Sequence, residues 1–304
     1  MREFTPVLQQ RVWGGELLRE WFAGARTALP IGEAWLLSDH PAMRTMDERG
    51  LPITGADDPN EWFPVLVKVL HAKSDLSVQV HPDDHLVAQR GDRGKTEGWL
   101  ILTAEEGARI CYGHHYEDGE EMRRAIAEDR LQEGLRYVPV RAGEYYPVPP
   151  GTVHALGAGV VALEVQQSSD LTYRLYDYGR LENGKPRALH VAEGIAVVSF
   201  PQRVNEGRAG ALDALVDVFE HPVAGALLYD RQPYFVFATL EVHGEWHNVA
   251  HTCVRSLVVV VLFGDVRMDA VANNGRLFRT WLLAPGEQVR LVGDGMVALI
   301  GVPR

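Results

Sequence analysis

Three polar residues alternate with valines in residues 73–84, KSDLSVQVHPDD. In an extended strand alternate side chains share a face, so Ser77, Gln79 and His81 point one way and the valines between them point the other. The valines suit an apolar core. The polar side chains then need partners, because burying them unpaired is costly. A bound metal ion is one such partner, and a hydrogen-bonded interior pair is the alternative.

A second stretch, residues 143–157, reads GEYYPVPPGTVHALG. Its spacing is Gly143, five residues, Pro149, one residue, Gly151, two residues, His154. This spacing resembles the second motif of the cupin barrels, in which a tight Pro/Gly turn delivers a histidine into the barrel as a metal ligand. The position where that motif usually has Asn is Ala158.

The first cupin motif usually has His-x-His and a glutamate a few residues later, whereas this chain has Gln79-x-His81 and a candidate Glu97 sixteen residues on. Those differences point to one branch, the type I phosphomannose isomerases, which the chain resembles over most of residues 1–200. The matching stretches are residues 32–41, 63–84, 94–102, 146–156 and 164–180. Several separate blocks in family order are more specific than any single motif.

The resemblance implies a cupin fold and one zinc ion per chain. The implied metal ligands are Gln79, His81, Glu97 and His154. Two imidazoles, one carboxylate and one amide oxygen suit Zn²⁺ at about 2.0–2.2 Å and leave room for a water or for substrate oxygens. Without thiolates, the set is not a structural cysteine site.

Two further side chains are expected to reach the same cavity and bind substrate. Lys95 lies two residues before Glu97, and in a strand it would share that residue's face. Ser77 likewise lies two residues before Gln79. The alternatives are a solvated loop lysine and an incidental serine.

The resemblance implies an aldose–ketose isomerase that interconverts mannose 6-phosphate and fructose 6-phosphate through a cis-enediol. A base must carry a proton between C1 and C2. Lys95 can do so only if its pKa falls from about 10.4, whereas Glu164, on a valine-rich strand after the metal histidine, would need its pKa raised. Glu164 could equally be an ion-pair partner of Lys95 or of Arg174, and the sequence leaves the base open.

The family's catalytic arginine falls on Arg174 in TYRLYD. A guanidinium stays protonated, so Arg174 cannot be the base. We expect it to polarise a reacting oxygen or to bind the phosphate through two hydrogen bonds, and thus to contact substrate.

Two other classes stay open. One is a metal-dependent oxygenase on the same barrel, which usually holds iron with two histidines and one carboxylate. The other is a non-catalytic sugar-phosphate-binding cupin, since a fold alone does not fix a function. The extra Gln79, together with Lys95 and Arg174, favours phosphosugar chemistry.

Short β-branched or aromatic runs recur between Gly, Pro and Asp clusters. They predict a mostly β fold of two cupin-like β-barrel or jelly-roll domains with a few short helices. The expected strands are residues 65–70, 76–81, 99–103, 145–148, 160–165, 171–176, 234–242, 256–263, 277–283 and 296–302. Helices are expected after a capping box at Asp118 and Glu121, and over residues 191–198 and 211–219.

A polar, glycine-containing segment at residues 200–210 predicts a domain boundary. We expect a catalytic cupin domain with a small helical insertion over residues 1–205 and a C-terminal β-domain over residues 206–304. A Pro-Gly pair followed by G-x-G-x-V-A-L occurs in both parts, from Pro150 and from Pro285. If the parts are related, the second is a degenerate cupin without metal, because Val289 and Arg290 flank the place of the histidine.

The chain of 304 residues has 30 Lys and Arg against 41 Asp and Glu, a formal charge of −11. Phosphate backbones repel such a chain, so we expect no nucleic-acid partner, and an anionic substrate needs a local basic cluster. Cys111 and Cys253 cannot form a disulfide framework. We see no secretory signal, and the apolar run 257–263 is far shorter than the ~20 residues of a membrane helix. We therefore expect a cytoplasmic monomer or homodimer that acts on a small phosphosugar and binds no membrane.

Overall fold

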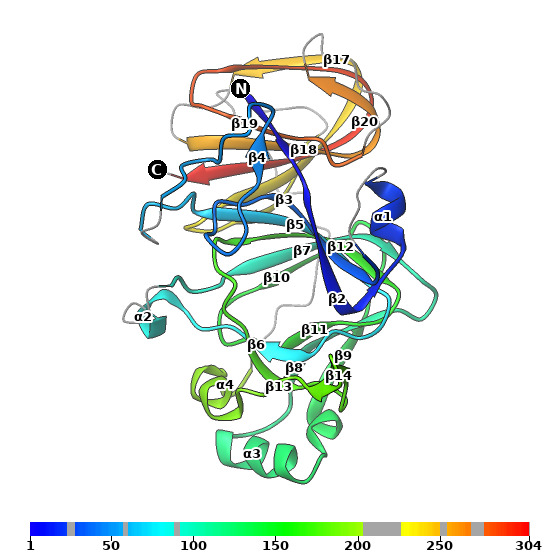
Figure 1. The fold of residues 1–304 in the computed structure, drawn as a ribbon, viewed down its shortest axis with the longest axis vertical. Coiled ribbons are helices and arrows are strands. Elements are labelled where there is room, and N and C mark those ends of the chain that lie inside the picture. Colours follow the sequence, from blue (N-terminus) through cyan, green and yellow to red (C-terminus); the bar gives the residue numbers. More distant parts are fainter. Residues whose placement is uncertain are drawn as a thin grey trace.

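The computed structural model describes residues 1–22, 28–56, 60–87, 92–202, 226–249, 254–268 and 277–303. Within these residues the chain is mostly β, with antiparallel sheets and a few short helices, which confirms the predicted fold class. Three sheets are stacked as layers along the long axis of the molecule (Figure 1). In the described part of the chain no sheet closes on itself as a barrel.

Hydrogen bonds join the strands of each sheet in an order that differs from their order in the chain. The six-stranded sheet contains β10 (Tyr145–Val148), β7 (Glu97–Ala104), β12 (Val160–Gln167), β5 (Val65–Ala72), β3 (Ile31–Leu37) and β2 (Val7–Gly15). The five-stranded sheet contains β13 (Tyr173–Tyr176), β6 (Val78–Val80), β11 (His154–Leu156), β8 (Arg109–His114) and β9 (Leu135–Pro139). The seven-stranded sheet contains β16 (Ala226–Arg231), β17 (Val236–Val249), β20 (Gln288–Pro303), β18 (Val254–Met268), β19 (Thr280–Leu283), β1 (Arg2–Thr5) and β4 (Met46–Asp47). A separate hairpin joins β14 (Leu181–Glu182) to β15 (Lys185–Pro186).

The helices are short and lie at the periphery. They are α1 (Leu17–Trp21), α2 (Asp84–Val87), α3 (Gly119–Ala127) and α4 (Val191–Val197), with a 3₁₀ turn η1 (Leu131–Gly134). The predicted N-cap is confirmed: the Asp118 carboxylate accepts from the backbone N–H groups of Glu120 and Glu121, which offsets the unpaired donors at the start of α3. The reciprocal half of the capping box differs, because Glu121 accepts from the backbone N–H of Glu117 rather than from that of Asp118. The helix predicted at 211–219 lies outside the described residues. No described helix is both long enough and apolar enough to cross a membrane.

Two apolar cores hold the layers together. One lies between the six-stranded and five-stranded sheets and includes Trp99 and Leu156. The other lies between the six-stranded and seven-stranded sheets and includes Val67, Leu163 and Phe237. The six-stranded sheet is therefore covered on both faces, which explains why β5, β7 and β12 read as nearly continuous apolar runs.

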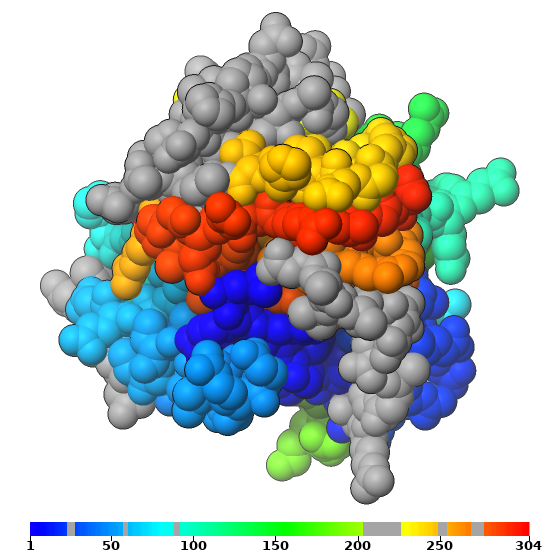
Figure 2. All heavy atoms as spheres, turned by 90° about the horizontal axis from the view of Figure 1, so that it is seen from above, coloured from blue at the N-terminus to red at the C-terminus, as the bar shows by residue number. Residues whose placement is uncertain are grey.

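The N-terminal strand lies in the same sheet as the C-terminal strands. β1 pairs antiparallel with β19, with Arg2 opposite Leu282, and β4 continues the sheet beyond β1. Figure 2 shows the dark blue N-terminal residues beside the red C-terminal strands. The predicted boundary between residues 205 and 206 lies outside the described residues, so it stays a prediction.

One hydroxyl ties the middle layer to the C-terminal strands. The ring of Tyr145 on β10 crosses Gly98 on β7, where any side chain would overlap it. Its hydroxyl donates to the Asp230 carboxylate on β16 at 2.7 Å. The residue next to Gly98 is Glu97, so this contact bears on the strand that begins with a candidate metal ligand.

Candidate metal centre and cavity

Three of the predicted metal ligands meet at one point. His81 lies just after β6, Glu97 begins β7 and His154 begins β11, directly after the turn at Gly151. One ligand atom from each of the three lies within 4.8 Å of the others, and all three side chains are buried. In the part of the chain that the structure describes, no other group of histidine, cysteine and acidic side chains meets in this way.

Backbone carbonyls orient both imidazoles. His81 Nδ1 donates to the carbonyl of Leu171, and His154 Nδ1 donates to the carbonyl of Thr152, each at 2.8 Å. Because a carbonyl only accepts, each ring carries its proton on Nδ1 and keeps a lone pair on Nε2. Burial lowers the pKa of His154 to about 4 and that of His81 well below its ordinary value. Both rings are therefore neutral at pH 7, as metal ligands must be.

The lone pairs converge on the carboxylate. His154 Nε2 lies 3.3 Å from Glu97 Oε1, and His81 Nε2 lies 3.7 Å from Glu97 Oε2. The Lys95 ammonium already lies beside His81 Nε2 and Glu97 Oε2, whereas the opposed lone pairs of His154 Nε2 and Glu97 Oε1 still call for a proton or a cation between them. Two imidazole nitrogens and a carboxylate are the donor set of catalytic zinc sites, and the backbone hydrogen bonds on Nδ1 supply the outer support that such sites use. The residues present thus fit a divalent metal.

Gln79 lies at the edge of this cluster. Its strand β6 pairs with β11 so that Gln79 is directly opposite His154. Its amide Nε2 lies 3.3 Å from His154 Nε2. The fourth predicted ligand therefore contacts one of the other three, His154, and it also lines the cavity beside the cluster.

Lys95 stands between the cluster and the cavity. Its Nζ lies 2.7 Å from Glu97 Oε2, 3.2 Å from His81 Nε2 and 4.0 Å from Glu164 Oε1. Burial alone would lower the pKa of Lys95, but the carboxylates of Glu164 and Glu97 outweigh it and raise the pKa above its ordinary value. Lys95 is therefore an ammonium group in this state.

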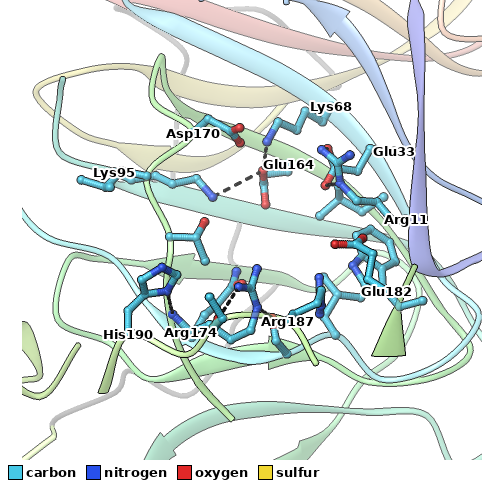
Figure 3. A pocket seen from close by; sticks show the side chains of 18 residues that line it. Arg11, Glu33, Lys68, Lys95, Glu164, Asp170, Arg174, Glu182, Arg187 and His190 are labelled. Atoms are coloured by element: carbon cyan, nitrogen blue, oxygen red, sulfur yellow. Dashed lines mark hydrogen bonds and ion pairs between the residues drawn. The ribbon is translucent and has the colours of Figure 1, made fainter. Parts of the chain in front are cut away.

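Glu164 projects from β12 into the same cavity (Figure 3). Its Oε1 lies 3.5 Å from Lys68 Nζ, and its Oε2 accepts from Trp99 Nε1 at 3.0 Å. Burial would raise its pKa, but Lys95 and Lys68 outweigh burial and lower it. Glu164 is therefore a carboxylate, and its cationic neighbours are these two lysines rather than Arg174.

Arg174 lies on the opposite wall of the cavity. β13 pairs with β6 so that Arg174 is opposite Gln79. Its Nε donates to Ser77 Oγ at 3.2 Å, and its Nη1 donates to the carbonyl of Ala188 at 2.9 Å. Among the described residues its side chain has no carboxylate within ion-pair distance. Arg174 and Ser77 thus keep charge and hydrogen-bonding capacity for a bound anion.

The cavity has a volume of about 500 Å³ and an unusually ionic lining. Its charged residues are Arg11, Glu33, Lys68, Lys95, Glu164, Asp170, Arg174, Glu182 and Arg187. Sequence reasoning predicted Lys95, Glu164 and Arg174 but missed the others. The missed signal is a charge inside an apolar strand, as in VLVKVLHA at Lys68 and IGEAWLL at Glu33.

Comparison with known proteins finds similar sequences and structures. A family model described as the phosphomannose isomerase type I catalytic domain matches residues 1–98. The chain is 38% identical over 213 residues to mannose-6-phosphate isomerase of Streptococcus mutans, which covers 65% of this chain and 67% of that protein. It is 39% identical over 215 residues to mannose-6-phosphate isomerase ManA of Bacillus subtilis, which covers 65% of this chain and 68% of that protein.

Solved structures extend the likeness to the whole chain. The crystal structure of the mannose 6-phosphate isomerase from Bacillus subtilis is 28% identical, with a TM-score of 0.86 over 98% of both chains. A zinc-bound mannose 6-phosphate isomerase, 17% identical with a TM-score of 0.74, shares the fold over 100% of this chain and 99% of that one. Because the identity holds over two thirds of the curated relatives, the chain belongs to the type I phosphomannose isomerase family.

Proposed function

We propose that this chain is a zinc-dependent isomerase that interconverts mannose 6-phosphate and fructose 6-phosphate. The observation that carries the proposal is the meeting of His81, Glu97 and His154 beside a cavity that the guanidinium of Arg174 also faces. Family membership supplies the reaction, and the geometry supplies a place for each part of it.

Gln79, His81, Glu97 and His154 would hold the metal. When bound, a zinc ion supplies a Lewis acid that polarises sugar oxygens and stabilises negative charge that develops on them. The two Nδ1–H groups stay bound to backbone carbonyls, so the rings keep their orientation while substrate enters.

Glu164 is the better candidate for the base. Neither candidate has the pKa shift expected of a base, since the pKa of Lys95 is raised and that of Glu164 is lowered. Glu164 is preferred on geometry, because its carboxylate faces the cavity whereas Lys95 Nζ is bound to Glu97 Oε2 at 2.7 Å. Glu164 would take the proton from one carbon and return it to the next, which gives the cis-enediol route expected of an aldose–ketose isomerase. Lys95 would donate a hydrogen bond to the oxygen that gains charge.

Arg174 and Ser77 would bind the substrate anion. A guanidinium presents a planar fork that matches phosphate oxygens, and a hydroxyl beside it adds a donor. The protein's net charge is negative, so an anionic substrate depends on such local cations. We further propose that the enzyme acts in the cytoplasm, as a monomer or homodimer.

The test is a coupled assay of mannose 6-phosphate conversion, with elemental analysis of the same sample. We expect about one zinc per chain, loss of turnover with a chelator, and recovery when zinc is restored. Binding of mannose 6-phosphate without interconversion would instead indicate a sugar-phosphate sensor. Bound iron with oxygen consumption would indicate an oxygenase.

A further inference from the structure

Lys68 is a charged residue within a buried, mostly apolar strand. It lies in the middle of β5, VLVKVLHA, where every residue is buried, and only 3% of its surface is exposed. A buried ammonium group costs several kcal/mol unless it is well paired. An apolar residue would pack in this core without that cost, so the presence of Lys68 indicates a role on the face of the strand that lines the cavity.

The sheet register places Lys68 between an aromatic ring and the proposed base. On β12 its direct partner is Glu164, and on β3 its direct partner is Trp35. Lys68 Nζ lies 3.5 Å from Glu164 Oε1 and 4.6 Å from the centre of the Trp35 ring. The ring holds the ammonium from one side by a cation–π contact while the carboxylate binds it on the other.

Beyond Glu164 the row continues to Trp99 on β7, which is its partner on that strand. The indole N–H of Trp99 donates a hydrogen bond to Glu164 Oε2, and Lys68 Nζ forms an ion pair with Glu164 Oε1. Both oxygens of the carboxylate are thus held by side chains that are themselves buried in the sheet. Glu164 is fixed in orientation without any contact from the substrate.

Charges alternate along one wall of the cavity (Figure 3). The order is Arg11, Glu33, Lys68, Glu164 and Lys95. Lys95 Nζ lies 2.7 Å from the Glu97 carboxylate but 4.0 Å from that of Glu164. Lys95 is therefore the ion-pair partner of Glu97, on the metal side of the cavity, and Lys68 is the ion-pair partner of Glu164. Without Lys68, Glu164 would compete with Glu97 for one ammonium.

We propose that Lys68 is a positioning residue for catalysis: it holds the Glu164 carboxylate in its reactive orientation and leaves Lys95 to the metal side of the cavity. This inference rests on the isomerase function proposed above. It assigns to Lys68 no contact with the reacting atoms. Its effect on turnover must therefore pass through Glu164.

A double-mutant cycle tests that dependence. The variants are Lys68→Met, Glu164→Gln and the double variant, each assayed for kcat and KM with mannose 6-phosphate, bound zinc and thermal midpoint. Lys68→Met should lower kcat about 30-fold, with KM within about threefold and zinc still near one per chain. In the Glu164→Gln background the same change should alter kcat by less than about twofold, because the group it acts through is gone.

The opposite pattern overturns the proposal. If Lys68→Met lowers kcat by the same factor in both backgrounds, or leaves kcat unchanged, Lys68 does not act through Glu164. If Lys68→Met fails to fold, the double variant, which removes both charges together, is compared with Glu164→Gln. Equal kcat values in these two variants support the inference. A further tenfold loss of kcat in the double variant, on the order of 1.4 kcal/mol, contradicts it.

A matched control separates this inference from the proposed function. Lys73→Met removes an exposed lysine just beyond the end of the same strand and should leave kcat unchanged. If neither the unmodified protein nor Lys73→Met interconverts the sugars, the proposed function fails. If both do so and the cycle shows no coupling, only the role of Lys68 fails.

Discussion

Two turns of the same geometry open the strands that carry His154 in one part of the molecule and Val289 in the other. In each, proline is the second residue and glycine the third, and the fourth N–H donates to the first carbonyl at 3.2 Å. Gly151 and Gly286 both have φ of +79°, the value that a type II turn requires at this place. The local backbone is thus repeated, as the sequence pattern indicated.

The two places differ in what the next residues meet. His154 points its Nε2 at Glu97, between layers whose cavity face carries charges. Val289 is buried in the apolar core of the C-terminal sheet, and its neighbour Arg290 turns outward to Glu245 at 2.8 Å. The turn therefore aims a side chain inward in both places, and the type of that side chain, with the layer facing it, decides whether a metal can bind.

The largest expected effect separates these two positions. His154→Ala removes a metal ligand, so zinc and activity should fall together, with turnover down by at least about 10³-fold. Val289→Ala should keep zinc and keep turnover within about threefold, while it lowers the free energy of unfolding by about 2 kcal/mol. Metal analysis, the coupled assay and urea unfolding measure these outcomes. An active, metal-free His154→Ala would remove that residue from the site.

A smaller loss of activity is expected when a residue that binds substrate, rather than a metal ligand, is removed from the cavity. Arg174→Ala removes the cation that has no carboxylate partner among the described residues, so kcat/KM should fall by about 10²-fold or more. Bound zinc should stay near one per chain, because Arg174 is no ligand. The coupled assay and elemental analysis decide it, and normal turnover in this variant would end the proposed role of Arg174.

The turn glycines themselves offer a milder comparison. A Cβ at Gly151 would overlap Ser199, whereas a Cβ at Gly286 would meet nothing within 4 Å. Gly286→Ala should cost only the strain of positive φ, about 1 kcal/mol, with activity unchanged. Gly151→Ala should cost more and lower turnover about tenfold by shifting His154. Equal losses of stability and activity in the two variants would contradict the contrast.

The free energy of unfolding should also depend on pH through the charged residues that line the cavity. Arg11 and Lys68 overcome the effect of burial and lower the pKa of Glu33 to about 2. Its unfolded pKa is higher, so Glu33 stabilises the fold above about pH 4.5, and this contribution disappears as pH falls toward 2. In metal-free protein, the difference in unfolding free energy between the unmodified chain and Glu33→Gln should be constant above pH 6 and shrink by about 3 kcal/mol on acidification. A difference independent of pH would refute this assignment.

Local signals predicted much of the structure. The N-cap at Asp118 and the strand at residues 145–148 are found where the sequence places them. The spacing around Gln79, His81 and His154 brought distant residues to one point, because each motif fixes its side chain relative to a short strand or turn. The roles of these residues in catalysis stay predictions.

Other features depend on contacts between distant strands. The strand predicted at 234–242 extends as β17 through Gly244, and that at 256–263 extends as β18 through Gly264. Both glycines have positive φ, which in a sequence indicates a turn, yet both residues remain paired with β20. A lysine within an apolar strand is a local signal at Lys68, but its partners on the neighbouring strands, Glu164 and Trp35, cannot be read from a local pattern.

The Tyr145 hydroxyl, which reaches Asp230 across the bare backbone of Gly98, makes the cavity dependent on strands that contribute nothing to its lining. The shared core behind β7 and β12 has the same effect. A fragment limited to the six-stranded and five-stranded sheets would expose a large hydrophobic surface and would be prone to aggregate. Separating the two parts by truncation is therefore a poor route to a minimal enzyme, whereas redesign of the outer face of the C-terminal sheet leaves the chemistry untouched.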